Sequence, residues 1–165
     1  MDQNIWEYDD FIFKGDELNG MTAKGKAKVK TRGQTDLVIP AVTPDGLPLK
    51  KIADNAFYRR GLTSVIIPDT VESIGYDAFG VCKLKEVKLP EALVNIEGFA
   101  FYRNKLAKVE FGSKVKRIEP SAFAMNELSE IALPETLEYI GASAFYKNAF
   151  ETITFPKALT IIDMY

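Results

Sequence analysis

The sequence contains no histidine, and it has a single cysteine, Cys82, among its 165 residues. Without histidine it lacks the commonest general base, the usual pairs of Ser or Cys with His, and most zinc sites. One cysteine also excludes an intrachain disulfide. These absences argue against an enzyme, and we expect no catalytic residue, no metal site and no cofactor.

Charge of one sign and long apolar runs are also scarce. The formal net charge is −2, which is too small to indicate a nucleic-acid partner. No apolar run approaches the ~18 residues of a membrane span, so we expect no membrane insertion. Residues 1–4 lack the pattern of a signal peptide. The chain is thus expected to be cytoplasmic if complete, and extracellular or at the cell surface if it is part of a longer secreted chain.

The sequence does contain a repeat of 22 residues. Ala-Phe pairs recur at this period and place Phe57, Phe79, Phe101, Phe123 and Phe145 in one column. An isoleucine column precedes them: Ile52, Ile74, Ile96, Ile118, Ile140 and Ile162. The consensus is L-x-x-V-x-I-P-x-x-V-x-x-I-x-x-x-A-F-x-x-N-x. It divides the chain into a degenerate unit 37–61, full units 62–83, 84–105, 106–127 and 128–149, and a partial unit 150–165.

This pattern predicts a repeat solenoid. Val65 and Ile67 indicate a short strand with one buried face, which ends at Pro68 because proline lacks a backbone donor. One unit cannot bury its own apolar side, so units stack and their strands form a parallel sheet. The A-F-x-x-N segment suits a short helical or 3-10 turn. We expect its last column to form a buried ladder that satisfies backbone groups: Cys82, Asn104, Asn126 and Asn148.

These columns resemble the BspA-type leucine-rich repeats of bacterial surface proteins. The resemblance rests on segments such as Leu62-Thr-Ser-Val-Ile-Ile-Pro68 and Ile140-Gly-Ala-Ser-Ala-Phe145, and it covers roughly residues 37–165. It implies surface display, adhesion or binding to host matrix, and it carries over no catalytic residue. The sequence departs from the family by favouring Asn over Cys in the last column.

Residues 1–36 do not repeat, and we predict that they form a β-type cap over the first coil. Lys14-Gly15-Asp16 indicates a turn. A strand in the next stretch would place five cations on one face: Lys24, Lys26, Lys28, Lys30 and Arg32. One interpretation is a polyanion patch, and the other is an edge strand that lysines protect against pairing. The acids Asp9, Asp10, Asp16 and Glu17 could neutralise it.

Two surfaces of the solenoid carry candidate binding residues. Outward strand positions alternate in charge between rungs, as in Glu86, Lys108 and Glu130, which predicts cross-strand ion pairs on a solvated sheet. The turn after each phenylalanine is more unusual, because a tyrosine and a cation recur in every second unit. The candidate ligand-binding residues are Tyr58, Arg59, Tyr102, Arg103, Tyr146 and Lys147. Tyr and Arg are favoured interface anchors, although Arg stems could simply lie over the tyrosines as padding.

The sequence therefore predicts a non-catalytic binding or adhesion module of a bacterial cell-surface protein, with a protein or glycan ligand. The alternative is an intracellular protein-interaction scaffold. The partial unit leaves Ile153, Phe155, Leu159 and Ile162 incompletely covered. That end predicts either further repeats or end-on self-association between copies.

Overall fold

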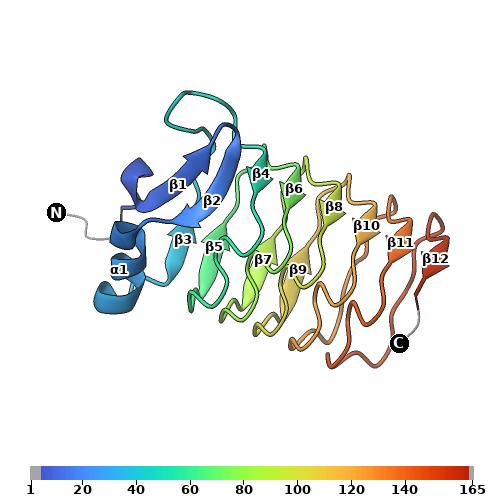
Figure 1. The fold of residues 1–165 in the computed structure, drawn as a ribbon. Coiled ribbons are helices and arrows are strands. Elements are labelled where there is room, and N and C mark those ends of the chain that lie inside the picture. Colours follow the sequence, from blue (N-terminus) through green and yellow to red (C-terminus); the bar gives the residue numbers. More distant parts are fainter. Residues whose placement is uncertain (1–4, 164–165) are drawn as a thin grey trace.

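The computed structural model describes residues 5–163, so the expectations for residues 1–4 and for the last two residues of the partial unit lie outside it. The chain forms a solenoid of about five turns with repeats of about 22 residues, as predicted. Its coils stack in one direction from the cap toward the C-terminal end (Figure 1).

The longest sheet runs along the isoleucine column, where no strand was predicted. Each coil contributes a strand of two residues: β4 (Lys51–Ile52), β6 (Ser73–Ile74), β8 (Asn95–Ile96), β10 (Arg117–Ile118), β11 (Tyr139–Ile140) and β12 (Ile161–Ile162). The strands are parallel and in register, with Ile74 opposite Ile96. Each coil therefore repeats the position of the coil before it.

The predicted strands before the proline column form two shorter parallel sheets. They are β3 (Asp36–Val38) with β5 (Ser64–Ile66), and β7 (Glu86–Lys88) with β9 (Lys108–Glu110). The central valine of each repeat strand is buried and its two neighbours are exposed. Residues 130–132 and 152–154 occupy the same place in later coils without forming a strand.

The Ala-Phe turns form neither an α-helix nor a 3-10 helix, which corrects the expectation of a short helical or 3-10 turn. Two residues per turn have positive φ, for example Phe99 (59°) and Arg103 (52°), and such residues break a right-handed helix. Consequently Tyr102 donates its N–H within the coil to Phe99 O, whereas Phe101 donates to Ala122 O in the next coil, both at 2.9 Å. Alternate donors thus join neighbouring coils.

The predicted phenylalanine column is confirmed. Neighbouring rings stack nearly parallel, with centroids 5.1–5.7 Å apart and interplanar angles of 3–12°. The rings of Phe57, Phe79, Phe101 and Phe123 are fully buried, and Phe145 at the far end is partly buried. The stack therefore forms the centre of the core along the whole array.

The cap begins with a 3-10 turn, η1 (Tyr8–Asp10), and an antiparallel hairpin of β1 (Phe11–Lys14) and β2 (Glu17–Met21). The turn between the strands lies at Gly15, whose φ of +60° suits glycine. Strand β2 then pairs in parallel with β4 and so extends the long sheet over the first coil. The boundary between cap and array at residue 36 stays a prediction.

The lysine-rich segment is helix α1 (Ala23–Arg32), so the prediction of a strand there is wrong. The Thr22 side chain accepts a hydrogen bond from the Gly25 N–H and caps the helix, and Gly33 ends it with φ +67°. Gly25 packs so closely on the Asp10 carbonyl that an added Cβ would lie 2.3 Å from its oxygen. The helix therefore depends on contacts with residues far away in the sequence.

Candidate functional site

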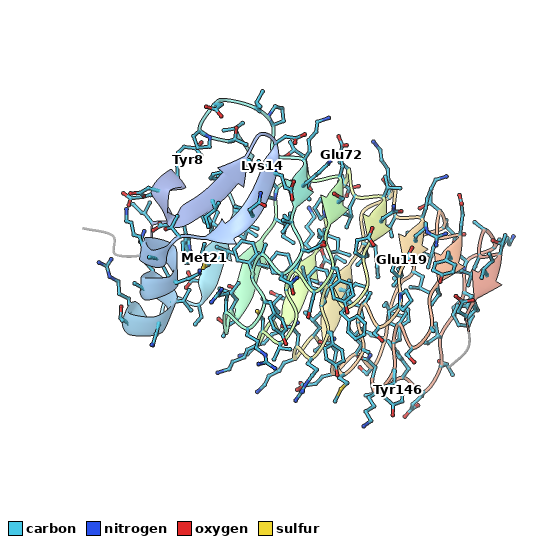
Figure 2. The ribbon with its side chains drawn as sticks, in the orientation of Figure 1. Tyr8, Lys14, Met21, Glu72, Glu119 and Tyr146 are labelled. Atoms are coloured by element: carbon cyan, nitrogen blue, oxygen red, sulfur yellow. The ribbon has the colours of Figure 1, made fainter. Side chains whose placement is uncertain are left out.

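All six candidate ligand-binding residues lie on one edge of the solenoid. We call this the turn edge, defined by residues 58–63, 80–85, 102–107, 124–129 and 146–151. Backbone hydrogen bonds join its coils, from Arg59 N–H to Gly80 O at 3.0 Å and from Arg103 N–H to Ala124 O at 3.0 Å. Figure 2 shows Tyr146 on this edge and Glu72 on the opposite one. Tyrosine–cation pairs two coils apart are thus separated by roughly 10 Å.

The tyrosines of the turn edge differ in how they are held. The Arg59 guanidinium lies 5.0 Å from the centroid of the Tyr58 ring, and the Lys147 ammonium lies 5.4 Å from that of Tyr146. Tyr102 instead contacts Phe99 edge-to-face at 5.2 Å. Tyr146 is 54% exposed, and Tyr58 and Tyr102 are partly buried. In two of the three pairs, Tyr58 with Arg59 and Tyr146 with Lys147, the cation therefore lies over the tyrosine ring, as the alternative interpretation expected.

A ladder of side-chain amides supports the turn edge from inside, as predicted. Asn104 donates to Phe79 O and Phe101 O at 2.9 and 3.1 Å, and its own carbonyl accepts from Leu84 N–H at 3.0 Å. Asn126 and Asn148 repeat this pattern one and two coils further on. Each amide thus donates hydrogen bonds to the backbone carbonyls of two neighbouring coils and accepts one from a backbone N–H.

Cys82 occupies the same column and replaces the asparagine. Its thiol donates to Phe57 O at 3.3 Å, and the side chain is buried. Burial raises the pKa of the Cys82 thiol above its usual value, so the thiolate is disfavoured. The structure therefore confirms the expected place of Cys82 in the buried ladder.

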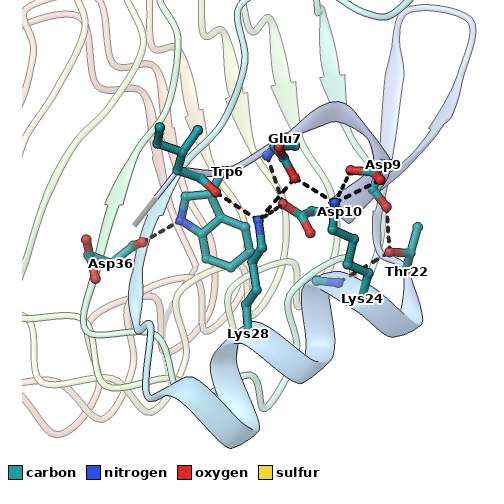
Figure 3. A network of polar contacts seen from close by, with 10 residues as sticks. Trp6, Glu7, Asp9, Asp10, Thr22, Lys24, Lys28 and Asp36 are labelled. Carbon is teal, nitrogen blue, oxygen red and sulfur yellow. Dashed lines mark hydrogen bonds and ion pairs between the residues drawn. The ribbon is translucent and has the colours of Figure 1, made fainter. Parts of the chain in front are cut away.

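The alternative polyanion patch is dispersed by the helix, which corrects the expectation that its five cations share one face. Lys24 pairs with Glu7 at 2.6 Å and Asp9 at 2.7 Å, and these hydrogen bonds raise the pKa of Lys24. Lys28 is buried against Asp10 (Figure 3). Asp9 and Asp10 thus neutralise part of the segment, as anticipated. Besides Lys24, three cations of α1 are exposed: Lys26, Lys30 and Arg32.

The same contacts account for the acidic cluster of the cap. The carboxylates of Glu7, Asp9 and Asp10 lie within 4.8 Å of one another, a spacing that could hold a cation. Figure 3 shows the ammonium groups of Lys24 and Lys28 among these carboxylates. The cluster therefore joins helix α1 to η1.

The outward strand positions form charge pairs, but not in the predicted direction. Lys108 pairs with Glu110 of its own strand rather than with a neighbouring rung. This hydrogen bond is the main reason why the pKa of Lys108 is raised, and Glu86 and Glu130 on adjacent rungs add to the effect. Instead of the expected cross-strand pairs, Lys108 forms an ion pair with Glu110 of its own strand. Its attraction to Glu86 and Glu130 on the adjacent rungs acts over a longer range.

The turn edge also carries four cations that the sequence analysis did not single out: Arg60, Lys83, Lys85 and Lys105. They lie within four columns after the one that Arg59 and Arg103 share. Writing the units in 22-residue register and comparing charge column by column is the signal that would have found them.

The fold defines a leucine-rich-repeat solenoid, and sequence comparison names the family. Residues 50–165 match the BspA type leucine rich repeat region in six copies, so the chain belongs to this family. Its fold and family are typically non-catalytic. Within residues 5–163, no helix has the length and apolar character needed to cross a membrane. No curated protein sequence matches the chain significantly.

Solved structures agree with the fold. The leucine-rich repeat protein TpLRR of T. pallidum is 24% identical, with a TM-score of 0.74, and the match covers 94% of this chain and 79% of that one. The pneumococcal vaccine antigen PcpA is also 24% identical, with a TM-score of 0.54, over 92% of this chain and 37% of PcpA. At this level of identity, both likenesses concern the fold.

Proposed function

We propose that this chain is a non-catalytic binding or adhesion module at a bacterial cell surface, and that its turn edge binds a host or matrix protein or glycan. The observation that carries the proposal is the placement of three tyrosine–cation pairs on one edge at a two-coil period. Membership of a repeat-module family supports it. An extended ligand could contact several equivalent pairs at once, and linked weak contacts multiply.

Charge pairing favours this edge over the other surfaces. On the strand face Lys108 is paired with Glu110, and on the cap Lys24 and Lys28 are paired with acids. A ligand there would compete with existing ion pairs. Arg59, Arg103 and Lys147 are exposed and form no ion pair with any residue between 5 and 163. Their charge is therefore available to a partner.

The double variant Tyr102→Ala with Arg103→Ala tests the proposal. Against the best ligand from a glycan and matrix-protein array, we expect at least tenfold weaker binding, or ~1.4 kcal/mol, because one central contact pair is lost. Titration calorimetry measures the effect, and the melting temperature should change little. The matched control is Lys26→Gln with Lys30→Gln on α1. Unchanged binding in the first variant, with loss in the control, would contradict the assignment to the turn edge.

We also propose end-on self-association through the last described coil. Phe155, Ile161 and Ile162 are 47–50% exposed there, and β12 pairs only with β11 among the strands of residues 5–163. A hollow of about 470 Å³ lies between Phe145 and Phe155. Sedimentation velocity should show concentration-dependent dimers that Phe155→Lys removes. A monomer at all concentrations, with the variant behaving identically, would count against this contact.

A further inference from the structure

Given the proposed function of the turn edge, we infer that its ligand is a linear acidic polysaccharide. The inference rests on a group of cations that we call the basic edge: Arg59, Arg60, Lys83, Lys85, Arg103 and Lys105. The group lies in the first three coils of the turn edge and includes two of the candidate ligand-binding residues, Arg59 and Arg103.

The basic edge is a local concentration of charge in a chain whose net charge is −2. Segments 58–63, 80–85 and 102–107 contain these six cations and no acid. The two following segments of the same edge, 124–129 and 146–151, contain one cation and two acids. The positive surface is therefore confined to three consecutive coils.

Backbone hydrogen bonds fix the spacing of these cations. Lys83 donates its N–H to Leu62 O at 2.8 Å, and Lys105 donates to Leu84 O at 2.9 Å, so the two lysines occupy the same position one coil apart. Coils stack with phenylalanine centroids 5.1–5.4 Å apart in this region. The result is two cations in each of three consecutive coils, with Lys83 and Lys105 aligned along the solenoid axis.

Protein carboxylates leave these charges largely uncompensated. None of the six cations forms an ion pair with a residue in the described range 5–163, whereas Lys50 and Lys116 pair with Glu72 and Glu138 on the opposite edge. Five of the six are exposed, and Arg60 is partly buried. Two acids flank the group: Asp77, whose carboxyl interacts with Arg59, and Glu127, one coil beyond Lys105. Like charges at this spacing repel, and a polymer with regular anions would relieve that repulsion.

The tyrosines distinguish between kinds of polyanion. Single-stranded nucleic acid binds largely by stacking its bases on open aromatic faces. Here Arg59 lies over the Tyr58 ring, and Tyr102 is partly buried against Phe99, so neither ring resembles an open stacking platform. An acidic polysaccharide needs no stacking, because its carboxylates or sulfates accept charge-assisted hydrogen bonds from arginine and lysine. Its anions recur along a linear chain, as the cations do along this edge.

Binding of heparin and polygalacturonate to the whole chain tests the inference, with neutral dextran, a thymidine oligonucleotide and polyglutamate as comparison probes. We expect the two acidic polysaccharides to bind, and Lys83→Gln with Lys105→Gln to weaken that binding at least tenfold and to reduce its salt dependence. Lys26→Gln with Lys30→Gln removes the same number of exposed charges elsewhere and should leave binding unchanged.

Three outcomes would overturn the inference. They are absence of polysaccharide binding, equal losses in the two double variants, and tighter binding of the oligonucleotide or polyglutamate than of either polysaccharide. In each case, an array ligand that still depends on Tyr102 and Arg103 would leave the proposed function standing. If no ligand depends on the turn edge, both fail.

Discussion

Phe101→Ala is expected to lower the free energy of unfolding by ~3–5 kcal/mol, the largest effect of any single substitution considered for this chain. The Phe101 ring is fully buried and stacks on Phe79 and Phe123, with centroids 5.4 Å away on each side. Truncation would leave a cavity between two coils that cannot collapse, because backbone hydrogen bonds fix the distance between them. Urea unfolding followed by circular dichroism measures the loss.

Phe155→Ala is the matched control for this prediction. Phe155 is 48% exposed at the C-terminal end of the array, so its truncation removes little buried surface. We expect a loss well below 1.5 kcal/mol, since a full burial of a large apolar side chain is worth only ~1.5–3 kcal/mol. Equal losses in the two variants would contradict the role of the phenylalanine stack.

Asn126→Ala is expected to lower the free energy of unfolding by ~1–3 kcal/mol. The amide of Asn126 donates to Phe101 O and Phe123 O at 3.0 Å and accepts from Leu106 N–H at 3.0 Å. Without it, the buried Leu106 N–H loses its hydrogen-bond partner, whereas Phe101 O and Phe123 O still accept from Asn104 and Asn148. A buried group left without a partner costs ~1–3 kcal/mol. The same urea titration measures this change.

Cys82→Asn provides the opposite test of the amide ladder. The Cys82 thiol donates one hydrogen bond, whereas the Asn104 amide makes four, so an asparagine at position 82 could complete the first rung. The free energy of unfolding should stay equal or rise. A large loss in Cys82→Asn, together with a negligible one in Asn126→Ala, would show that the ladder does not stabilise the coils.

The array could be predicted from the sequence because every coil meets the same environment. The positions of Phe101 and Asn104 recur in register. The core role inferred for the phenylalanine and the ladder role inferred for the asparagine therefore applied to every unit. The turn conformation was not accessible in this way. Phe99 and Arg103 adopt positive φ without being glycine, and propensity gives no sign of it. The long sheet was missed for a similar reason, since its strands are only two residues long.

The cap could be predicted only in part, because long-range contacts decide its structure. Alternating lysines are compatible with a strand, yet Lys24 and Lys28 are also four residues apart and so lie on one face of a helix. What selects the helix is their pairing with Glu7, Asp9 and Asp10. Hydrophobic periodicity carries no information about these partners. For the candidate site, the recurrence of tyrosines in every second unit located the turn edge. That its cations lack ion-pair partners became evident only from the structure.

Lysine acetylation with and without bound polysaccharide, resolved by mass spectrometry, tests most directly whether the ligand lies along the turn edge. Bound heparin is expected to slow acetylation of Lys83, Lys85 and Lys105 and to leave Lys50 and Lys116 on the opposite edge unchanged. Protection of Lys26 and Lys30 on α1, or equal protection of both edges, would contradict the assignment.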